Sequence, residues 1–522
     1  MLESIWWAFV LRTAQGAVEA SPTLLCGVLT AGILRRMVGP AGTRRLFGTH
    51  HAAGLLQAWG LGMLLPVCSL GVLPVAHEMR RAGVSGGNIL AFCLAAPLLN
   101  PISFLYGLTL AEPLTILCYT SGSLILSLVC GLVWERLFPR ENHLDPVLLT
   151  AAESQPMPTP GVRRILAVAV TAARALAGIA LVYFVVGLVA SGLLSALLPF
   201  GGLQATMKSN DPFSPLLMAI LVAPAYMGPL PGMMRIGLMF EHGNSVGAAF
   251  VLLVLGIAVN VGLLAWTFRT FAPKAALAWF GLVGLATLSI AYVLENPLKP
   301  HVEPADHTHA FDDFTNPFPS HMQVDPAFVW GKLTERLGVL ESFSLVFLAA
   351  LMAAGMAERL GRWRGALEAW LNLPPTDLPG KRSWDLVIPG PILGGIALLG
   401  LVVFSVFSVF VYYPPPDQLL QDMARVKADA IVAVRTGKTE EGIRRLEHWD
   451  LLTRKLQVGV FLRTGKLNGD ATKQAEEFRE SLEKVRDALL AANNDEARTL
   501  LPEVEKTYWA CRQSFARLSG LE

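Results

Sequence analysis

Charged residues are scarce in this chain of 522 residues: they make up 16% of it, where a soluble protein carries about 25%. Hydrophobic residues make up 53%, and the mean hydropathy is +0.49. Together these values exclude a single soluble domain and a disordered chain. The net charge of +2 lacks the basic excess of a nucleic-acid-binding protein. The sequence also has no nucleotide-binding loop of the Gly-x-x-x-x-Gly-Lys type, so ATP-driven work is not indicated.

The six cysteines show no spacing typical of a disulfide framework. Five lie in apolar stretches, where a thiol is most often a small buried residue, and Cys511 stands alone in a polar region. The N-terminus does not resemble a cleaved signal sequence, because Arg12 and Glu19 interrupt its apolar run. The apolar stretches contain no recognisable nucleophile–base set or metal motif, so an enzyme is not indicated.

Charge is unevenly distributed along the chain. The segment 414–522 carries 36 charged side chains, whereas the much longer segment 1–413 carries only 46. The sequence therefore predicts a membrane-embedded body followed by a soluble tail. Within the tail, apolar residues recur every three to four positions near 417–436, 438–465, 470–492 and 495–518, which predicts a four-helix bundle.

The body contains many stretches long enough to cross a membrane, which takes about 20 mostly apolar residues. Eight clear candidates lie near 16–34, 88–108, 113–134, 165–190, 247–267, 275–293, 340–357 and 386–412. Two further apolar stretches, near 52–75 and 214–234, are interrupted by proline and glycine. Each of these two is either a full span or a re-entrant hairpin.

The placement of lysine and arginine favours the hairpins. Short loops with clustered basic residues are predicted at 35–45, 80–81, 136–164 and 359–382. Full spans would put the second and third clusters opposite the first, whereas hairpins leave all four on one, cytoplasmic, side. Each half then crosses three times, so the second half is inverted. The predicted parts are a first membrane repeat (1–137), a cytoplasmic linker (138–163), a second membrane repeat (164–293), a periplasmic His-rich loop (294–338), two extra transmembrane helices with a cytoplasmic loop (339–413) and a soluble four-helix bundle (414–522).

The two halves contain matching motifs at a nearly constant separation. Pro66 matches Pro224, and Gly83–Gly87 matches Gly243–Gly247. Inverted repeats with broken helices are typical of transporters. Non-helical backbone persists at membrane depth only inside protein or beside water, so its free polar groups can hold a substrate. Proline and glycine kinks satisfied by neighbouring helices are the alternative interpretation.

Two motifs in the first half resemble those of a known group, the predicted permeases of the ArsP/YraQ type. They are Pro-x-Cys-Ser-x-Gly-Val-x-Pro-Val-Ala, from Pro66 to Ala76, and Arg-x-Gly-x-Ser-x-Gly, from Arg81 to Gly87. The resemblance covers roughly residues 15–295 and implies a permease; some members of the group export organoarsenicals.

The first motif departs from the family at one cysteine. Family members typically carry Cys-Ser-Cys-Gly, but here Cys68 remains and Leu70 takes the second position. A thiolate pair is what a trivalent arsenical or another soft metal prefers. Contact between Cys68 and the substrate, and a purely structural role for Cys68 in a tight hairpin, both stay open.

The candidate substrate path combines the two broken segments with polar residues of the adjoining helices. It consists of Pro66, Cys68, Ser69, Gly71, Pro74, Ser85, Asn88, Asn100, Pro224, Gly228, Pro231, Ser245 and Asn260. Ser85 and Ser245 also suit helix N-caps, and the asparagines can instead bond across helices. Glu19 and Glu112 are coupling candidates, because an intramembrane carboxylate is a functional candidate, although both also suit a helix start.

The loop at 301–321 holds four of the ten histidines together with four acidic residues. Imidazole and carboxylate together suit zinc, copper or nickel. A candidate divalent-metal site therefore consists of His301, His307, His309 and Asp312. Because no fixed metal-site spacing is present, a solvated loop without metal is the competing interpretation.

The last helix of the tail resembles that of cytochrome c-prime type bundles, in which a Cys-x-x-Cys-His run attaches haem. Here Tyr508 stands in place of the first cysteine and Arg512 in place of the axial histidine, while Cys511 and Phe515 match. Without the second thiol and the imidazole, no haem is expected. The tail is therefore interpreted as a haem-free interaction or regulatory bundle.

The sequence as a whole predicts an all-α polytopic inner-membrane permease with an inverted repeat, about eight full spans, two re-entrant hairpins and a C-terminal helical bundle. It would export a small solute, such as a metalloid or organometalloid compound, driven by protons or another gradient. The expected partners are the solute, the lipid bilayer and a periplasmic protein for the tail, with no nucleic acid and no cofactor. A divalent-metal transporter that uses the His loop and a membrane-anchored sensor with a ligand-binding tail remain alternatives. The loop at 294–338 and the tail are expected outside the cytoplasm.

Overall fold

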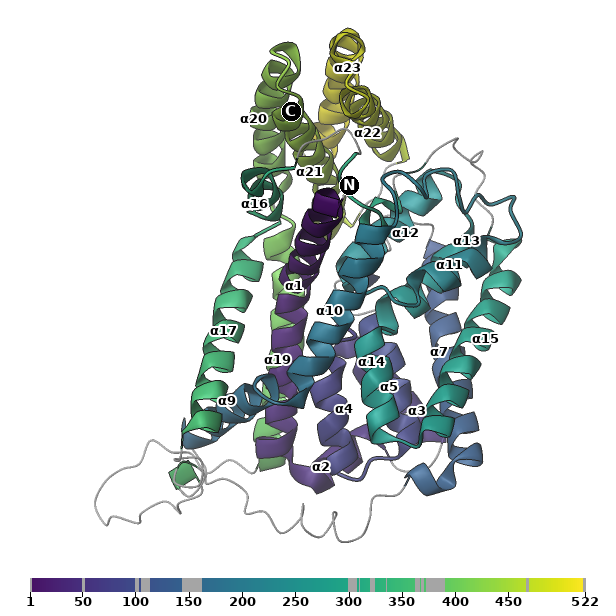
Figure 1. The fold of residues 1–522 in the computed structure, drawn as a ribbon, viewed down its shortest axis with the longest axis vertical. Coiled ribbons are helices and arrows are strands. Elements are labelled where there is room, and N and C mark those ends of the chain that lie inside the picture. The colour runs from purple at the N-terminus through teal and green to yellow at the C-terminus, as the bar shows by residue number, and fades with distance from the viewer. Residues whose placement is uncertain are drawn as a thin grey trace. The chain divides into compact units, whose positions relative to one another are not determined.

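A computed structural model of the protein describes residues 2–48, 52–98, 103–104, 113–142, 162–298, 308, 310–319, 324–334, 336–361, 367, 370–371, 390–465 and 469–519. Over these residues the regular structure is helical, apart from one isolated β-bridge between Lys208 and Asn244 (Figure 1). The chain forms two compact units, Met1–Val403 and Phe404–Glu522. The first is the expected body, and the second contains the expected tail.

The chain begins with one long helical segment. Helix α1 (Leu2–Ile33) continues through a π-helical turn, η1 (Leu34–Val38), into α2 (Gly39–Phe47). The predicted loop at 35–45 is therefore wrong, because these basic residues lie in helix. Arg36 is buried there and donates a hydrogen bond to the Thr171 hydroxyl group at 2.8 Å.

The first broken stretch is a re-entrant hairpin. It consists of α3 (Ala52–Leu64), a break at 65–71 and α4 (Val72–Arg81). Helices of 13 and 10 residues reach only about 20 and 15 Å, too short for a hydrocarbon core of about 30 Å. The two ends of the stretch lie together, because Arg44 donates to the Ala82 carbonyl at 2.8 Å.

The second broken stretch has the same form, with α11 (Ser214–Val222), a break at 223–228 and α12 (Pro229–Glu241). The Ser245 amide donates to the Met207 carbonyl at 2.9 Å, so the chain again leaves where it entered.

The two hairpins enter from opposite ends of the body. Helix α7 (Pro113–Leu137) contacts the residues that follow each hairpin, since its Tyr119 hydroxyl donates to the Val246 carbonyl at 2.7 Å and its Glu135 accepts from Ser85 at 2.8 Å. Tyr119 and Glu135 lie more than four helical turns apart, about 24 Å along a helix. Figure 1 shows the same arrangement, with α3 and α4 at one end of α7 and α11 and α12 at the other.

Five described helical stretches are long and apolar enough to cross a membrane, and a bent pair brings the number to six. The five are Glu3–Phe47, Leu114–Leu137, Ala180–Leu197, Pro273–Glu295 and Val339–Leu360, and the bent pair is Val246–Ala258 with Val261–Thr270. Their outer faces expose apolar side chains, for example Leu285 of α15 (Pro273–Glu295) and Val346 of α17 (Val339–Leu360). Such faces suit contact with lipid.

Not every predicted span has its predicted form. The span expected at 165–190 is wrong: α9 (Val162–Leu176) ends before Gly178, and the apolar helix is α10 (Ile179–Leu197). The stretch at 88–108 contains α5 (Gly86–Leu98), whose 13 residues are shorter than a full span, whereas the stretch at 386–412 contains α19 (Gly390–Tyr412), an apolar helix of 23 residues. The total of eight spans thus stays a prediction.

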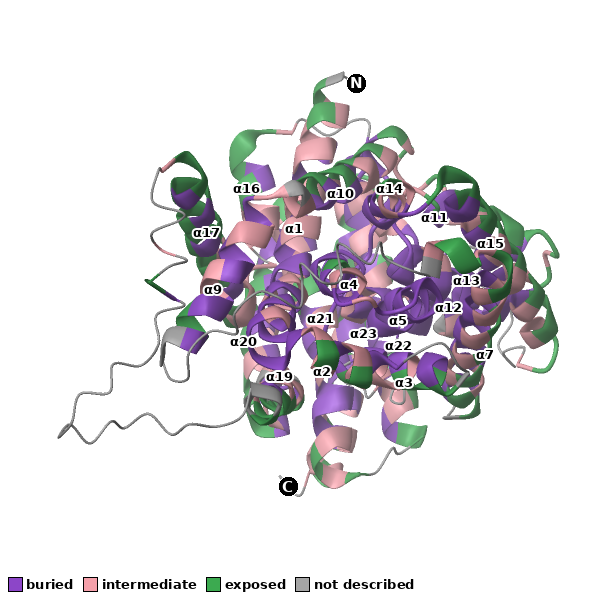
Figure 2. Ribbon diagram, turned by 90° about the horizontal axis from the view of Figure 1, so that it is seen from below, coloured by how far each residue is buried: buried purple, intermediate pink, exposed green. Residues whose placement is uncertain are grey.

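Helix α5 forms the centre of the body. All of its residues are buried (Figure 2), including the Asn88 side chain, which donates to the Phe47 carbonyl at 2.9 Å. It packs against α3, α4 and α7 and against the π-helical segment η3 (Leu252–Ala258) of the second half. The first hairpin and the bent helix of the second half therefore share one core.

The segments that carry the basic clusters of the body are connected at one end. Arg35 pairs with Glu78 at 3.6 Å, and Arg80 donates to the Glu141 carbonyl at 2.6 Å. The bond from Arg36 to Thr171 leads on to α9, where Arg174 pairs with Glu358 at 2.5 Å. These contacts link all four segments, as the hairpins require.

The second unit contains the predicted four-helix bundle. Its helices are α20 (Pro416–Arg435), α21 (Thr439–Thr464), α22 (Gly469–Leu490) and α23 (Asn494–Leu518). Gly437 and Gly465 follow the first two helices with positive φ angles, which glycine adopts without strain. The centre of the bundle holds Trp449, Phe478 and Tyr508, whose ring centroids lie 5.0 to 5.6 Å apart.

Candidate functional site

The break in the first hairpin is formed by its own short-range bonds. Pro66 has no N–H to donate and restricts the residue before it, so α3 ends there. The Cys68 sulfur then accepts a hydrogen bond from the Gly71 amide at 3.3 Å, directly before α4 begins at Val72. The five predicted residues of this break, Pro66, Cys68, Ser69, Gly71 and Pro74, are all buried. The Ser69 hydroxyl has no hydrogen-bond partner among the described residues.

Helix α1 crosses directly over this break. A methyl group added to Gly71 would lie 2.7 Å from the Thr23 carbonyl oxygen, and one added to Gly27 would overlap the Gly71 backbone. Only glycine allows the two backbones to approach so closely. Cys26, the residue before Gly27, is thereby brought close to Cys68, three residues before Gly71. The structure places a second thiol near Cys68, from a residue far away in the sequence.

The break in the second hairpin meets the first. Its Tyr226 hydroxyl group lies near the Cys68 thiol and is buried with no hydrogen-bond partner among the described residues. Gly187 of α10 touches both sides of the junction, because a methyl group there would lie 3.0 Å from Leu70 Cδ2 and 3.2 Å from Asn260 Oδ1. We call Cys26, Cys68 and Tyr226 the hairpin junction.

The predicted residues of the second half lie around this junction. Pro224 and Pro231 are half-buried and Gly228 is buried at the start of α12. Asn260 occupies the break between η3 and α14 (Val261–Thr270), where the helix axis bends by 57°. Its side-chain oxygen caps α14 by accepting the Leu263 amide at 2.9 Å, whereas its Nδ2 is buried with no partner among the described residues. Polar atoms of Ser69 and Asn260 are thus available for another group.

The turns that follow the hairpins make equivalent contacts in the two halves. Ser85 donates to Glu135 at 2.8 Å, and Ser245 donates to Glu295 at 2.7 Å. Ser245 also caps its helix by accepting the Ala248 amide at 2.9 Å, and Ser85 makes the corresponding bond at 3.4 Å. The predicted N-capping is therefore confirmed.

The acidic partners Glu135 and Glu295 were missed in the sequence. They are separated along the chain by the same distance as Ser85 and Ser245, and this was the signal that could have revealed them.

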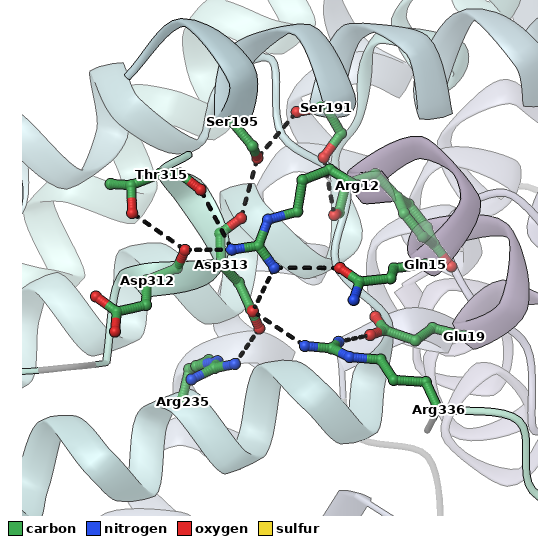
Figure 3. Close-up of polar contacts among 11 residues, drawn as sticks. Arg12, Gln15, Glu19, Ser191, Ser195, Arg235, Asp312, Asp313, Thr315 and Arg336 are labelled. Atoms are coloured by element: carbon green, nitrogen blue, oxygen red, sulfur yellow. Dashed lines mark hydrogen bonds and ion pairs between the residues drawn. The ribbon is translucent and has the colours of Figure 1, made fainter. Parts of the chain in front are cut away.

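A second group of polar residues lies between α1 and the second hairpin (Figure 3). We call it the arginine cluster; it comprises Arg12, Glu19, Arg235, Asp313 and Arg336. Asp313 Oδ1 accepts from Arg12 at 3.0 Å and from Arg336 at 3.3 Å, and its Oδ2 accepts from Arg235. Glu19 pairs with Arg336. The expected position of Glu19 at a helix start is wrong, because α1 begins at Leu2.

Two members of the arginine cluster lie outside the spanning helices, and their ionisation is set by the cluster. Burial alone would raise the pKa of Asp313, but the positive charges of Arg235, Arg336 and Arg12 outweigh burial and hold that pKa well below its usual range. Burial would lower the pKa of Arg336, but Asp313 and Glu19 outweigh it and raise that pKa above its usual range. Both groups are therefore charged at neutral pH.

The histidine loop is described only in part. Asp312 is described, and its carboxylate accepts from the Gln204 side chain at 3.3 Å. His301, His307 and His309 lie outside the described residues, as do Asn100 and Glu112. Over the part of the chain that the structure describes, no three His, Cys, Asp or Glu side chains gather as a metal site would require.

The arginine cluster was only partly visible in the sequence. Arg12 and Glu19 interrupt the first apolar run, and Arg235 precedes the second glycine motif. Asp313 was one of the acidic residues of the histidine loop, but nothing in the sequence linked it to Arg12, 301 residues away.

Comparison with known proteins gives two matches. Residues 7–296, more than half of the chain, match the profile of the ArsP_1 family, described as predicted permease. UPF0718 protein YcgR of Bacillus subtilis (strain 168) is 28% identical over 131 residues, which are 25% of this chain and 45% of that protein. The chain thus matches less than half the length of that relative. No solved structure matches.

Proposed function

Because this chain belongs to the ArsP_1 family of predicted permeases, we propose that it carries a small solute through the membrane at the hairpin junction. The observation that carries the proposal is the meeting of two broken helices, with Gly187 of α10 close to both Leu70 and Asn260 and with Tyr226 near Cys68. Broken helices inside a membrane protein leave backbone and side-chain polar groups available at the depth where a solute must pass. The free polar atoms of Ser69 and Asn260 fit this role.

The proposed mechanism is alternating access by an inverted repeat. It is supported by the entry of the hairpins from opposite ends and by the Ser–Glu contacts that recur in the second half. In such a transporter, the two halves tilt against each other around a fixed central site. The absence of a nucleotide-binding loop favours a proton or ion gradient as the driving force, and Glu19 of the arginine cluster is the coupling candidate among the described residues.

The proposed solute is thiophilic, such as a metalloid or organometalloid compound. Soft ligands suit it, and the junction offers two thiols although Leu70 stands where the family carries its second cysteine. In this proposal Cys26 of α1 takes over the role of that missing thiol.

The proposed orientation puts the connected basic clusters in the cytoplasm, following the positive-inside rule. The loop at 294–338 and the bundle then lie outside the cytoplasm, and transport is directed outward. For the bundle we propose a haem-free role in binding a partner protein. Burial raises the pKa of its Cys511 to about 12, so this thiol is held in the unreactive, protonated form.

The thiol pair is tested by single substitutions in cells challenged with a trivalent organoarsenical. Cys26→Ser and Cys68→Ser should each lower resistance by about tenfold, because one thiol alone loses the chelating partner. Cys130→Ser, a buried thiol of α7, is the matched control and should leave resistance unchanged. Protein levels in the membrane are compared in parallel. Full resistance in both variants, at equal protein levels, would remove the thiophilic solute from the proposal.

A further inference from the structure

The arginine cluster joins residues inside the region that matches the permease family to residues beyond it. Arg12 on α1 and Arg235 on α12 lie within the region that matches the permease family, whereas Asp313 and Arg336 lie beyond residue 296. Both permease arginines point at the same carboxylate (Figure 3), and their side chains are only 10% and 19% exposed. A segment beyond the family match thus supplies the carboxylate that pairs with the two arginines of the permease region.

Within the described residues, Asp313 is the only carboxylate in ion-pair contact with Arg12 or Arg235. Glu19, the nearby acid of the core, pairs with Arg336 instead. The Nε atoms of Arg12 and Arg235 are buried and have no hydrogen-bond partner there. Two buried guanidinium groups from distant parts of the sequence, with donors to spare, form a receptor for an anion.

The position of the Asp313 carboxylate is fixed by hydrogen bonds to the backbone of its segment. Arg12 Nη2 donates to the carbonyls of Asp312 at 2.6 Å and Thr315 at 3.2 Å, and Ser195 donates to the Asp313 carbonyl at 3.0 Å. The flanking Phe311 and Phe314 are buried. This segment therefore presents its carboxylate to the arginines at a high effective concentration, as a tethered ligand does.

We propose that Arg12 and Arg235 form a binding site for an anionic group with two or more oxygens, and that Asp313 occupies this site as a tethered plug. An incoming carboxylate or phosphate-like group would bind the same two guanidinium groups only after the plug is displaced. Because the plug also connects α1, the second hairpin and Arg336, which precedes α17, its displacement frees the hairpin from its neighbours. This last role rests on the proposed function, whereas the binding site itself does not.

The site is tested by removing the plug from the full chain in detergent and adding inorganic phosphate or acetate. Asp313→Ala should lower the melting temperature, and either anion should restore it with a saturable dependence on concentration. Asp313→Asn, which keeps the shape of the side chain and loses its charge, should bind phosphate as well. The wild-type chain should respond at about tenfold higher anion concentration or more, because its own carboxylate occupies the site.

Two controls separate a site from general salt effects. Asp211→Ala removes a carboxylate that, among the described residues, accepts only the local Phe213 amide in a turn, and it should gain no response to either anion. Adding Arg12→Gln and Arg235→Gln to Asp313→Asn should abolish the response. Acetate and phosphate together distinguish a site for any oxyanion from one shaped for a carboxylate.

The proposal is overturned if neither Asp313 variant is stabilised by phosphate or acetate, or if the arginine substitutions leave the response intact. Failure of both variants to fold with these anions present during extraction also overturns it, because an empty anion site would accept them. Anion binding without transport by the same variants in vesicles would instead count against the proposed function alone.

Discussion

The contact between Glu295 and the start of α13 (Val246–Val251) gives the sharpest test of how the second hairpin is anchored. One oxygen of Glu295 accepts from the Ser245 hydroxyl at 2.7 Å and from the Gly247 amide at 2.6 Å. A hydrogen bond to a charged group contributes about 1.5–3 kcal/mol, and a negative charge at a helix N-terminus contributes about 0.5 kcal/mol more. Because Glu295 is half-buried, we expect Glu295→Ala to cost about 3 kcal/mol locally.

The equivalent change in the first half should cost less. Glu135 accepts from Ser85 at 2.8 Å, and this is the one bond to the turn that corresponds to the two at Glu295. We therefore expect Glu135→Ala to cost about 1.5 kcal/mol, half of the value at Glu295.

Hydrogen exchange of the full chain, followed by mass spectrometry, measures both effects. The amides at 246–251 should exchange about a hundredfold faster in Glu295→Ala, and those at 86–91 about tenfold faster in Glu135→Ala. Glu3→Ala, at an exposed site near the N-terminus, should change neither segment. Equal effects in the two halves, or a larger effect in the first, would refute the assignment of two bonds to Glu295.

Two further substitutions test packing and charge. Gly27→Ala places a methyl group against the Gly71 backbone, so it should cost a few kcal/mol of stability and reduce the folded yield. Gly281→Ala, in open space on α15, is the control and should leave the yield unchanged. Equal yields of the two variants would contradict the close crossing of α1 over the first break. In the bundle, burial would raise the pKa of Asp450, but Arg454 and Arg479, at 2.8 and 2.7 Å, outweigh it and lower that pKa. Its contribution to stability is therefore complete above the ordinary pKa of about 3.9 and is lost as the pH falls below it. Asp450→Asn should cost about 3 kcal/mol at pH 7, measured as faster exchange in α21 and α22, and the difference from wild type should shrink on acidification; a pH-independent difference would rule out the ion pair as its cause.

The hairpins were predictable because their signals are local. Proline removes a backbone donor and fixes φ wherever it stands, so the runs after Pro66 and Pro224 indicated breaks without any knowledge of their neighbours. The placement of arginine near each end then distinguished hairpins from spans, since charge near a span end has a preferred side. The four helices of the bundle were predictable from periodicity and glycine for similar reasons.

The errors came from features that hydropathy does not separate. The apolar face of the amphipathic α9 continues into α10, so a window over 165–190 detects one span where Gly178 divides two helices. The basic residues at 35–45 suggested a loop, but Arg36 finds Thr171 inside the fold and the helix continues.

The pairings that matter most for the candidate sites were beyond local analysis. Cys26 comes near Cys68, and Arg12 pairs with Asp313, only because segments from distant parts of the chain pack together. A single sequence shows that an arginine and an aspartate are present, but the partner of each depends on the whole fold. Only the matching motifs of the two halves offered a long-range signal, and it could have revealed only the Ser–Glu contacts.

The close packing of α1 and α5 around the first hairpin has a consequence for how the protein enters the membrane. Helices α3 and α4 are too short to be inserted as spans, and the break between them carries backbone groups that lipid cannot satisfy. The hairpin therefore gains a partner for its break only when α1 stands beside it, with Gly27 against Gly71. We expect biogenesis to proceed in two stages, in which the long helices are released into the bilayer first and each hairpin folds in afterwards.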